Sequence, residues 1–326
     1  MSRRGWLALG GILAFAALWA VNTPSFANLS RDRPVLLAHR GLGQPYTREG
    51  LGSDTCTASR MLPPEHGWLE NTIPSMAAAF RYGAEVVELD IHPTTDGEFA
   101  VFHDWTVDCR TDGTGVTREH SLAELRALDA GHGYTADGGR TFPFRGKGVG
   151  LIPTLGEVLE AFPARRFLIN VKSDDPAEGA ALAQFLDALP RARRSQLMAY
   201  GGARPIAVLR ERLPEVPVMS RPILKSCLLR YAALAWSGQV PAACRGTVVL
   251  VPANVAPWLW GWPDRFVARM EAVGSPVFLV NDWSSGFSEG IDTPADLAEK
   301  VPPGYSGGIW TDRIDRIGPL FPAAGP

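Results

Sequence analysis

The sequence predicts an α/β protein whose parallel strands close into a (β/α)₈ TIM barrel. Short apolar runs alternate with helix-like segments along the chain, and this alternation is typical of a parallel sheet. Charged and polar residues gather where several of these runs end, which is where such barrels place their active sites. An open doubly wound sheet is the alternative, but no G-x-G-x-x-G motif follows the first run.

The expected strands are apolar runs bounded by glycine, proline and polar residues. They are residues 35–38, 86–91, 99–102, 167–171, 196–200, 216–219, 247–251, 276–280 and 308–310. This is one run more than the eight of a closed barrel. The surplus run is 99–102, because it follows its predecessor after only a Thr-Asp-Gly turn, which suits a hairpin and is too short for a parallel crossover.

Capping residues mark the helices between these runs. Ser121 and Thr154 each precede a glutamate by three residues, the pattern of a capping box. Thr293-Pro294 supplies an N-cap followed by proline at the first helical position. The helix expected over residues 74–82 ends at Gly83, a residue typical of C-terminal caps.

Two segments, residues 42–68 and 105–153, are expected to be insertions. The second is rich in glycine and contains Arg110, Arg140, Arg145 and Lys147. Neither segment has room for a core of its own, so we expect both to fold as loops over the C-terminal face of the barrel. Substrate selection is expected to reside in these loops.

Residues 1–27 have the pattern of a signal peptide. Arg3-Arg4 precedes an apolar stretch over residues 6–21, and Ser25-Phe26-Ala27 supplies small residues for cleavage. This pattern predicts an exported protein, periplasmic or secreted, with its barrel domain in residues 28–326. An uncleaved membrane anchor is the alternative, although the stretch is shorter than the roughly 20 apolar residues that span a bilayer comfortably.

The four cysteines fit the oxidising compartment that export implies. Four cysteines permit three pairings, of which we favour Cys56 with Cys109 and Cys227 with Cys244. The first pair lies in two segments that flank motif residues, and the second pair brackets one apolar segment. Closing the longer loop stabilises the fold by about 4 kcal/mol in the chain-entropy model.

The balanced charge, a net −2, argues against a nucleic-acid partner, because the chain has no strong positive field. Local cations must then hold any phosphate-bearing small molecule. The run 86–104 places Glu88, Asp90 and His92 at alternate positions, so these side chains share one face of a strand. Two buried carboxylates this close require a cation or a shared proton.

Five motifs together resemble the glycerophosphodiester phosphodiesterase family, which is related to the phosphatidylinositol-phospholipase-C-like phosphodiesterases. They are His39-Arg40-Gly41, Glu70-Asn71-Thr72, Glu88-Leu89-Asp90, Val101-Phe102-His103-Asp104 and Gly308-Ile309-Trp310-Thr311-Asp312-Arg313, in the family's order. The resemblance implies a TIM barrel and a phosphoric diester hydrolase that converts glycerophosphodiesters to glycerol 3-phosphate and an alcohol.

The resemblance also implies roles for individual residues. His39 and His103 match the family's acid/base pair, and imidazole exchanges protons near neutral pH. Which histidine accepts and which donates stays open, as does attack by water or by the substrate's own hydroxyl. Arg40 offers a planar fork for two phosphate oxygens. Glu70 contacts the metal, the substrate or Arg40, and His92 lines the wall or touches the substrate.

Glu88 and Asp90 match the family's metal ligands, so the expected cofactor is a divalent cation, Ca²⁺ or Mg²⁺. Asn170 stands where the family has a third, glutamate ligand, and its amide oxygen contributes no charge. We therefore expect weaker metal binding, or recruitment of Asp174 or Asp175. Lys172 lies on the same side of this run and is expected to meet a phosphate oxygen.

Other readings of the chain remain open. Trp258, Trp260 and Trp262 fit a peripheral contact with a membrane. The site residues also fit a phospholipase D-like lyase that acts on intact lipid, because sphingomyelinases D resemble this family. A non-catalytic protein that binds phosphodiesters or lipid headgroups is a third reading, prompted by Asn170. A barrel glycosidase ranks last because it leaves the histidines unexplained.

Overall fold

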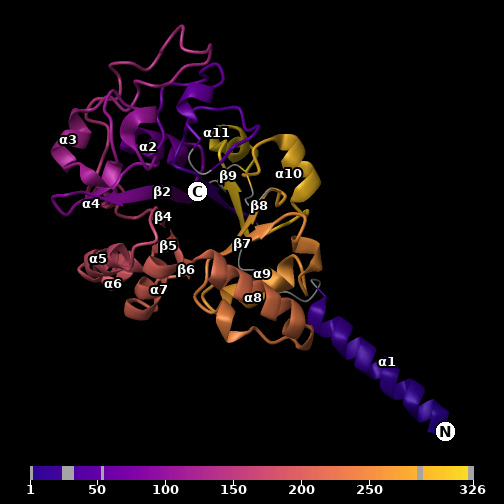
Figure 1. Ribbon diagram of the computed structural model, residues 1–326. Helices are drawn as coiled ribbons and strands as arrows, with labels where there is room; N and C mark the ends of the chain where they lie inside the picture. Colours follow the sequence, from indigo (N-terminus) through magenta and orange to yellow (C-terminus); the bar gives the residue numbers. More distant parts are fainter. Residues whose placement is uncertain (1–2, 24–32, 53–54, 285–288, 322–326) are drawn as a thin grey trace.

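The computed structural model describes residues 3–23, 33–52, 55–284 and 289–321. Within these residues, eight parallel strands form a nearly closed barrel, as the sequence predicts (Figure 1). The strands are β1 (Val35–Ala38), β2 (Val86–Pro93), β4 (Arg166–Val171), β5 (Leu197–Gly201), β6 (Val218–Met219), β7 (Val249–Pro252), β8 (Val277–Val280) and β9 (Gly308–Thr311). Their order in the sheet is β6-β5-β4-β2-β1-β9-β8-β7.

The barrel closes between β6 and the segment that leads into β7. The Val218 amide donates to the Gly246 carbonyl at 3.0 Å, and the Val248 amide donates to the Val218 carbonyl at 3.1 Å. Val218 and Thr247 accordingly form a parallel bridge. The two ends of the sheet therefore meet through a few backbone hydrogen bonds rather than through a full ladder.

The surplus run is the hairpin strand that the sequence predicts. Strand β3 (Phe99–Val101) pairs antiparallel with β2, with Ile91 opposite Val101. The Phe102 amide then donates to the Asp90 carbonyl at 3.0 Å. This turn back along β2 brings the residue after Phe102, His103, to the end of the strand that carries the carboxylates.

Helices surround the barrel, and their bounds follow from caps that are visible in the sequence. They are α2 (Ile73–Arg81), α4 (Leu155–Ala161), α5 (Pro176–Asp187), α6 (Arg191–Arg194), α7 (Ala203–Arg212), α8 (Arg221–Leu234), α9 (Asp264–Glu271), α10 (Pro294–Lys300) and α11 (Ile314–Ile317). Thr154 forms the predicted capping box, and Thr293 accepts from the Asp296 amide at 3.0 Å. Gly83, at φ 96°, follows the C-cap of α2 as predicted.

Two apolar layers hold the fold together. One lies between the sheet and the helices, and the other fills the inside of the barrel, where Leu37, Leu168 and Phe278 are buried. Val86 belongs to the inner layer and shares one face of β2 with Glu88 and Asp90. The barrel interior therefore changes from apolar to charged toward the C-terminal ends of the strands.

The two predicted insertions pack against each other. Residues 42–68 contain the short helix η2 (Ala58–Arg60), and residues 105–153 contain η3 (Val107–Cys109), η4 (Thr117–Glu119) and α3 (Leu122–Ala127). Ala58 and Met61 of the first segment form an apolar cluster with Tyr134 and Phe144 of the second.

A disulfide between Cys56 and Cys109 also joins the two insertions, and a second one links Cys227 to Cys244. Both favoured pairings are thus confirmed. The second disulfide ties α8 to η6 (Ala242–Cys244) on the outside of the barrel.

Helix α1 (Arg3–Asn22) extends away from the barrel on the side of α8 and α9 (Figure 1). Its end is held by Arg269, whose Nη2 donates to the Val21 carbonyl at 2.9 Å, and by η5 (Ala235–Ser237). None of the described helices is long and apolar enough to cross a membrane. The expected cleavage residues Ser25-Phe26-Ala27 lie outside the described residues, so signal cleavage stays a prediction.

Candidate active site

The sequence-predicted site residues converge at the C-terminal ends of neighbouring strands. His39 and Arg40 follow β1, Glu88 and Asp90 lie on β2, Asn170 lies on β4 with Lys172 just beyond it, and His103 follows β3. Strand β4 sets Asn170 directly opposite Asp90, and β5 sets Tyr200 opposite Asn170. Sheet register therefore aligns three polar side chains in one row across the barrel mouth.

The two carboxylates of β2 are fully buried, and each of their oxygens accepts a hydrogen bond from the protein. The Arg40 amide donates to Glu88 Oε2 at 3.1 Å, and the Tyr200 hydroxyl donates to Glu88 Oε1 at 2.7 Å. Asp90 accepts from Asn71 Nδ2 at 2.9 Å and from Asn170 Nδ2 at 2.8 Å. These donors satisfy the desolvated oxygens that burial would otherwise leave at a large cost.

Arg40 lies at the centre of the charged groups. Its Nη1 donates to Glu70 Oε1 at 2.9 Å, and its Nε lies 3.2 Å from His39 Nε2 and 3.4 Å from Asp90 Oδ2. Of the contacts left open for Glu70, the structure thus shows the one with Arg40. Lys172 Nζ approaches Asp90 Oδ1 from another side, at 3.6 Å.

The backbone after β1 aims Arg40 into the barrel mouth. Arg40 has φ 57° and Gly41 has φ 81°, so the chain reverses sharply as the strand ends. A Cβ at Gly41 would lie 2.6 Å from Ser75 Oγ and 3.0 Å from the Met76 nitrogen, which restricts this position to glycine. The turn is tied to the second motif, because the Asn71 amide donates to the Arg40 carbonyl at 2.9 Å.

Each candidate histidine is held through Nδ1 by an aspartate. His39 Nδ1 lies 2.5 Å from Asp312 Oδ1, and His103 Nδ1 lies 2.6 Å from Asp104 Oδ1. Because an ionised carboxylate only accepts hydrogen bonds, Nδ1 is the protonated nitrogen in both rings. This leaves Nε2 of each ring as the nitrogen that exchanges a proton.

The surroundings of the two histidines shift their pKa values in opposite directions. Burial lowers the pKa of His39, but Asp312 and Glu88 outweigh it and raise this pKa above its usual 6.5. Burial and the Arg40 guanidinium lower the pKa of His103 to about 4. The balance differs, since the carboxylates outweigh burial and Arg40 at His39, whereas burial and Arg40 outweigh Asp90 and Asp104 at His103.

The carboxylates of β2 also diverge. Burial and the neighbouring Asp90 raise the pKa of Glu88 to about 7. Burial acts in the same sense on Asp90, but Lys172, His103 and Arg40 hold its pKa below the ordinary range. Asp90 is therefore better compensated by neighbouring positive charge than Glu88.

The donor chemistry of this region fits a hard divalent cation. Glu88 and Asp90 offer carboxylate oxygens and Asn170 offers an amide, which are the oxygen ligands that Ca²⁺ and Mg²⁺ take. The part of the chain that the structure describes contains no group of three or more His, Cys, Asp or Glu side chains arranged to hold a metal. Glu88, Asp90 and Asn170 would thus supply two charged ligands and one neutral ligand.

Two expected reserve ligands are placed elsewhere, which corrects the prediction for them. Asp174 Oδ2 pairs with Arg204 Nε at 3.0 Å on the surface. Asp175 is the N-cap of α5, accepting from the Ala177 amide at 2.9 Å. Both carboxylates serve the start of neighbouring helices and neither joins Glu88 and Asp90.

His92 lines the wall of the barrel mouth. Its ring is buried, packs edge-on against Trp105 at 6.0 Å between ring centroids, and places Nε2 3.4 Å from the His103 carbonyl oxygen. Burial lowers the pKa of His92 to about 4. It therefore supports the backbone at His103.

Sequence reasoning missed several residues that hold the site together. Asp104, Asp312 and Asn71 stand inside recognised motifs, and their positions beside His103, Thr311 and Glu70 were an available signal. Tyr200 ends a predicted strand, but its hydroxyl contact with Glu88 depends on register. Arg110 was noted only as one of several cations in an insertion.

Fold and site together define a (β/α)₈ barrel whose mouth pairs two aspartate-held histidines with buried carboxylates and an arginine. The chain is similar to the family model described as "Glycerophosphoryl diester phosphodiesterase family", which matches residues 39–194. It is 34% identical over 174 residues to a glycerophosphodiester phosphodiesterase of Bacillus subtilis (strain 168). That match covers 52% of this chain and 50% of the relative, so the chain spans about half the length of this relative.

Solved structures show the same fold. A glycerophosphoryl diester phosphodiesterase domain from Mycobacterium tuberculosis superposes with a TM-score of 0.60 at 17% identity, covering 89% of this chain and 99% of that domain. An Oleispira antarctica phosphodiesterase, solved with the product sn-glycerol-3-phosphate, superposes with a TM-score of 0.53 at 19% identity, covering 91% and 98%. The TIM-barrel fold is thus confirmed.

Proposed function

We propose that this protein is an exported, metal-dependent phosphodiesterase that hydrolyses glycerophosphodiesters to glycerol 3-phosphate and an alcohol. The observation that carries the proposal is the pair of aspartate-held histidines beside Arg40, each with Nε2 as its proton-exchanging nitrogen. The match to the family model and the similarity to the Bacillus subtilis relative support the substrate class. Export is supported by the N-terminal sequence pattern alone.

Two proton transfers are required, and the site holds one base and one acid for them. One histidine removes a proton from the attacking hydroxyl, which is either water or the substrate's neighbouring hydroxyl. The second histidine donates a proton to the oxygen of the leaving alcohol as its bond to phosphorus breaks. In the second route, water then opens the cyclic phosphate, so both routes give glycerol 3-phosphate and the alcohol.

Arg40 and Lys172 are the proposed phosphate-binding cations. Both lie within 4 Å of the buried Asp90, which keeps them at the barrel mouth, and Glu70 orients the Arg40 guanidinium. A planar guanidinium that is already fixed stabilises the charge that develops on the phosphate oxygens without reorganising.

A divalent cation, Ca²⁺ or Mg²⁺, would be held by Glu88, Asp90 and the amide oxygen of Asn170. When bound, it would stabilise negative charge on the phosphoryl oxygens. Titration calorimetry with each cation tests this independently of turnover. We expect Glu88→Gln to abolish binding and Asn170→Glu to tighten it about tenfold or more, because the third ligand then carries a charge. Equal affinities in all three proteins would contradict this ligand set.

A lipid substrate is the second candidate, favoured by an exposed aromatic surface. Trp258 is 82% exposed and Trp260 38% exposed, and the Trp260 indole donates to the Ala232 carbonyl at 2.9 Å, in the helix α8 that ends at the exposed Leu234. Trp262 instead packs against Phe266 and Tyr305, so the proposed membrane contact narrows to Trp258 and Trp260. A phospholipase D-like lyase on intact lipid would use such a surface.

Product analysis by ³¹P NMR separates these functions. The full chain is incubated with glycerophosphocholine, or with lysophosphatidylcholine micelles, in the presence of Ca²⁺, Mg²⁺ or EDTA. Metal-dependent glycerol 3-phosphate that disappears in His39→Ala supports the proposal, and a cyclic lipid phosphate supports the lyase. Binding of glycerophosphocholine without turnover under any condition would indicate a non-catalytic binding protein and overturn the enzyme.

A further inference from the structure

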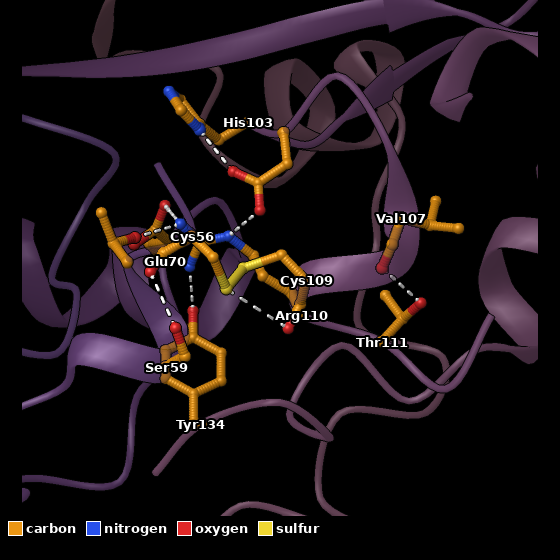
Figure 2. Close-up of a disulfide and its surroundings, with 11 residues drawn as sticks. Cys56, Ser59, Glu70, His103, Val107, Cys109, Arg110, Thr111 and Tyr134 are labelled. Carbon is orange, nitrogen blue, oxygen red and sulfur yellow. Dashed lines mark hydrogen bonds and ion pairs between the residues drawn. A yellow bond between two sulfur atoms is a disulfide. The ribbon is translucent and has the colours of Figure 1, made fainter. Parts of the chain in front are cut away.

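Arg110 of the second insertion joins the two halves of the proposed catalytic machinery. Its side chain is buried, with 2% of the residue exposed. Its Nε donates to Asp104 Oδ2 at 2.9 Å, and its Nη2 lies 3.2 Å from Glu70 Oε1 (Figure 2). One guanidinium therefore contacts both the carboxylate that holds His103 and the carboxylate that holds Arg40.

Further contacts fix Arg110 from its other side. Its Nη1 donates to the Tyr134 hydroxyl at 2.5 Å, and its Nη2 donates to Thr57 Oγ1 at 2.6 Å. The Gly133 amide donates to the Arg110 carbonyl at 3.1 Å. Both ends of the residue are thus tied to the insertions rather than to a strand of the barrel.

The Cys56–Cys109 disulfide lies next to these contacts. Cys56 precedes Thr57 and Cys109 precedes Arg110, so the disulfide links the residues next to both partners of the Arg110–Thr57 hydrogen bond (Figure 2). The two half-cystines are 53 residues apart in the chain, and besides the disulfide the two loops are joined here by side-chain contacts and by the Thr135 amide, which donates to the Ala58 carbonyl at 3.1 Å. The disulfide is therefore the covalent link that holds the two loops together beside Arg110, at the position from which Arg110 reaches Asp104 and Glu70.

Charge balance makes the position of Arg110 consequential. Although burial acts in the opposite sense, Arg110 and Arg40 hold the pKa of Glu70 below its ordinary value. If Arg110 moved away, the buried Asp104 would lose the guanidinium that donates to it and would keep the His103 ring as its hydrogen-bond partner, with Arg40 as the remaining cation that acts on it. Such a carboxylate turns toward water or is protonated, and in either case it stops orienting the His103 ring.

We propose that Arg110 is a positioning residue for the reaction and that the Cys56–Cys109 disulfide holds it in place, so that the oxidised protein is the active form. This inference deepens the proposed function and rests on it for the choice of substrate. A dithiol such as dithiothreitol supplies the reductant: it donates two electrons and two protons, leaving Cys56 and Cys109 as thiols while becoming a cyclic disulfide. Activity is then lost although no catalytic residue has changed.

The second disulfide provides a matched control, because Cys227–Cys244 joins α8 to η6 outside the barrel mouth. The test compares kcat and KM for glycerophosphocholine in the full-length C56S/C109S and C227S/C244S variants. We expect C56S/C109S to lose at least tenfold in kcat with KM changed less than threefold. C227S/C244S is expected to retain kcat within twofold. Equal kcat in both variants would overturn the proposal.

Substitutions that keep the disulfide cover the case in which C56S/C109S fails to fold. Arg110→Gln is expected to lower kcat about 100-fold, and Arg110→Lys to recover part of that loss, because a single ammonium keeps the charge but not both contacts. Thr57→Val removes one hydrogen bond and is expected to have a smaller effect of the same sign. Unchanged kcat in Arg110→Gln would contradict the positioning role.

A second measurement does not depend on turnover. Histidine ¹⁵N shifts report which ring nitrogen carries the proton, and we expect His103 to lose its Nδ1-protonated form in Arg110→Gln and in dithiothreitol-reduced wild type. His39 is expected to keep this form in both. A change at His103 in a protein that turns over no diester would reject the proposed function while supporting the positioning role. An unchanged His103 signal would reject the positioning role itself.

Discussion

Two triads of the same composition flank Arg40, and they are built differently. In the His39 triad (His39, Asp312, Arg48), Arg48 Nη2 donates to Asp312 Oδ2 at 2.5 Å behind the histidine. In the His103 triad (His103, Asp104, Arg110), Arg110 Nε occupies the equivalent place behind Asp104. Each arginine comes from one of the two insertions, so loops outside the barrel support both histidines.

The difference lies in what places the aspartate. Asp312 is 273 residues from His39, but β1 and β9 pair in register, and the His39 amide donates to the Thr311 carbonyl at 3.0 Å. The sheet therefore sets Asp312 beside His39. Asp104 follows His103 in a loop, where no ladder fixes the backbone, and there a buried arginine and a disulfide hold it. Strand register and cross-linked loops are thus two solutions to one positioning problem.

The two supporting arginines, Arg48 and Arg110, differ in how far their side chains are exposed to solvent. The Arg48 side chain is 26% exposed and also pairs with Asp292 and Glu289, whereas the Arg110 side chain is 3% exposed. An exposed pair is weakened by solvent, and a buried one is costly to break. We therefore expect the His103 triad to be more sensitive to its arginine than the His39 triad.

The largest expected effect tests whether both triads carry a catalytic histidine. His39→Ala and His103→Ala should each lower kcat by roughly 10²- to 10⁴-fold, the usual range for a positioned acid or base. The double variant should be little worse than the poorer single variant, because residues that act as a unit are not additive. Initial rates with glycerophosphocholine measure this. A single variant that retains more than a tenth of wild-type kcat would show that only one triad transfers protons.

The two disulfides should differ in their contribution to stability. The chain-entropy model gives about 4 kcal/mol for the loop closed by Cys56–Cys109 and about 3 kcal/mol for that closed by Cys227–Cys244. Urea unfolding of C56S/C109S and C227S/C244S measures both losses. A larger loss in C227S/C244S would mean that strain or residual structure, rather than loop length, governs the difference.

Asp312→Asn and Asp104→Asn should each lower kcat about 100-fold or more, because an amide can donate to Nδ1 and favour the wrong tautomer. Asp282→Asn is the control, since Asp282 is an exposed carboxylate that pairs with Lys300 Nζ at 3.1 Å. We also expect that no change of pH restores the kcat of Asp104→Asn. Normal kcat in either triad variant would remove that aspartate from the mechanism.

The smallest expected effect is a pH-dependent difference in stability. Burial tends to raise the pKa of Asp104, but Arg110 and His103 hold it below the usual 3.8. The stabilisation is therefore complete above this value and is lost as the pH falls through the lower folded-state pKa. The free energy of unfolding of wild type should exceed that of Asp104→Asn by about 2 kcal/mol near pH 6, and this difference should narrow below pH 4. Unfolding curves from pH 7 to pH 3 test this, and a gap that widens in acid would have the wrong sign.

Much of the site could be predicted because its residues sit in short motifs at strand ends. Glu88 and Asp90 share a face through the two-residue period of a strand, and His39 and His103 end apolar runs. The contacts of Arg110 and Tyr200 could not be predicted, because they depend on how a loop packs and on which strands are neighbours. Trp262 shows the same limit, since its sequence context matches that of the exposed Trp258 although its ring packs against Phe266.

The sequence by itself determined the barrel, its hairpin strand and the helix caps, which follow from alternation, capping and spacing over a few residues. It left three cysteine pairings possible, of which the favoured one is confirmed, and the resemblance of its motifs to a known family indicated the residues at the mouth. Only the tertiary structure decided that Asp312 orients His39, that Arg110 joins Asp104 to Glu70, and that Asp174 and Asp175 stay outside the site. Such contacts depend on sheet register and loop packing across long stretches of chain, and no local pattern encodes them.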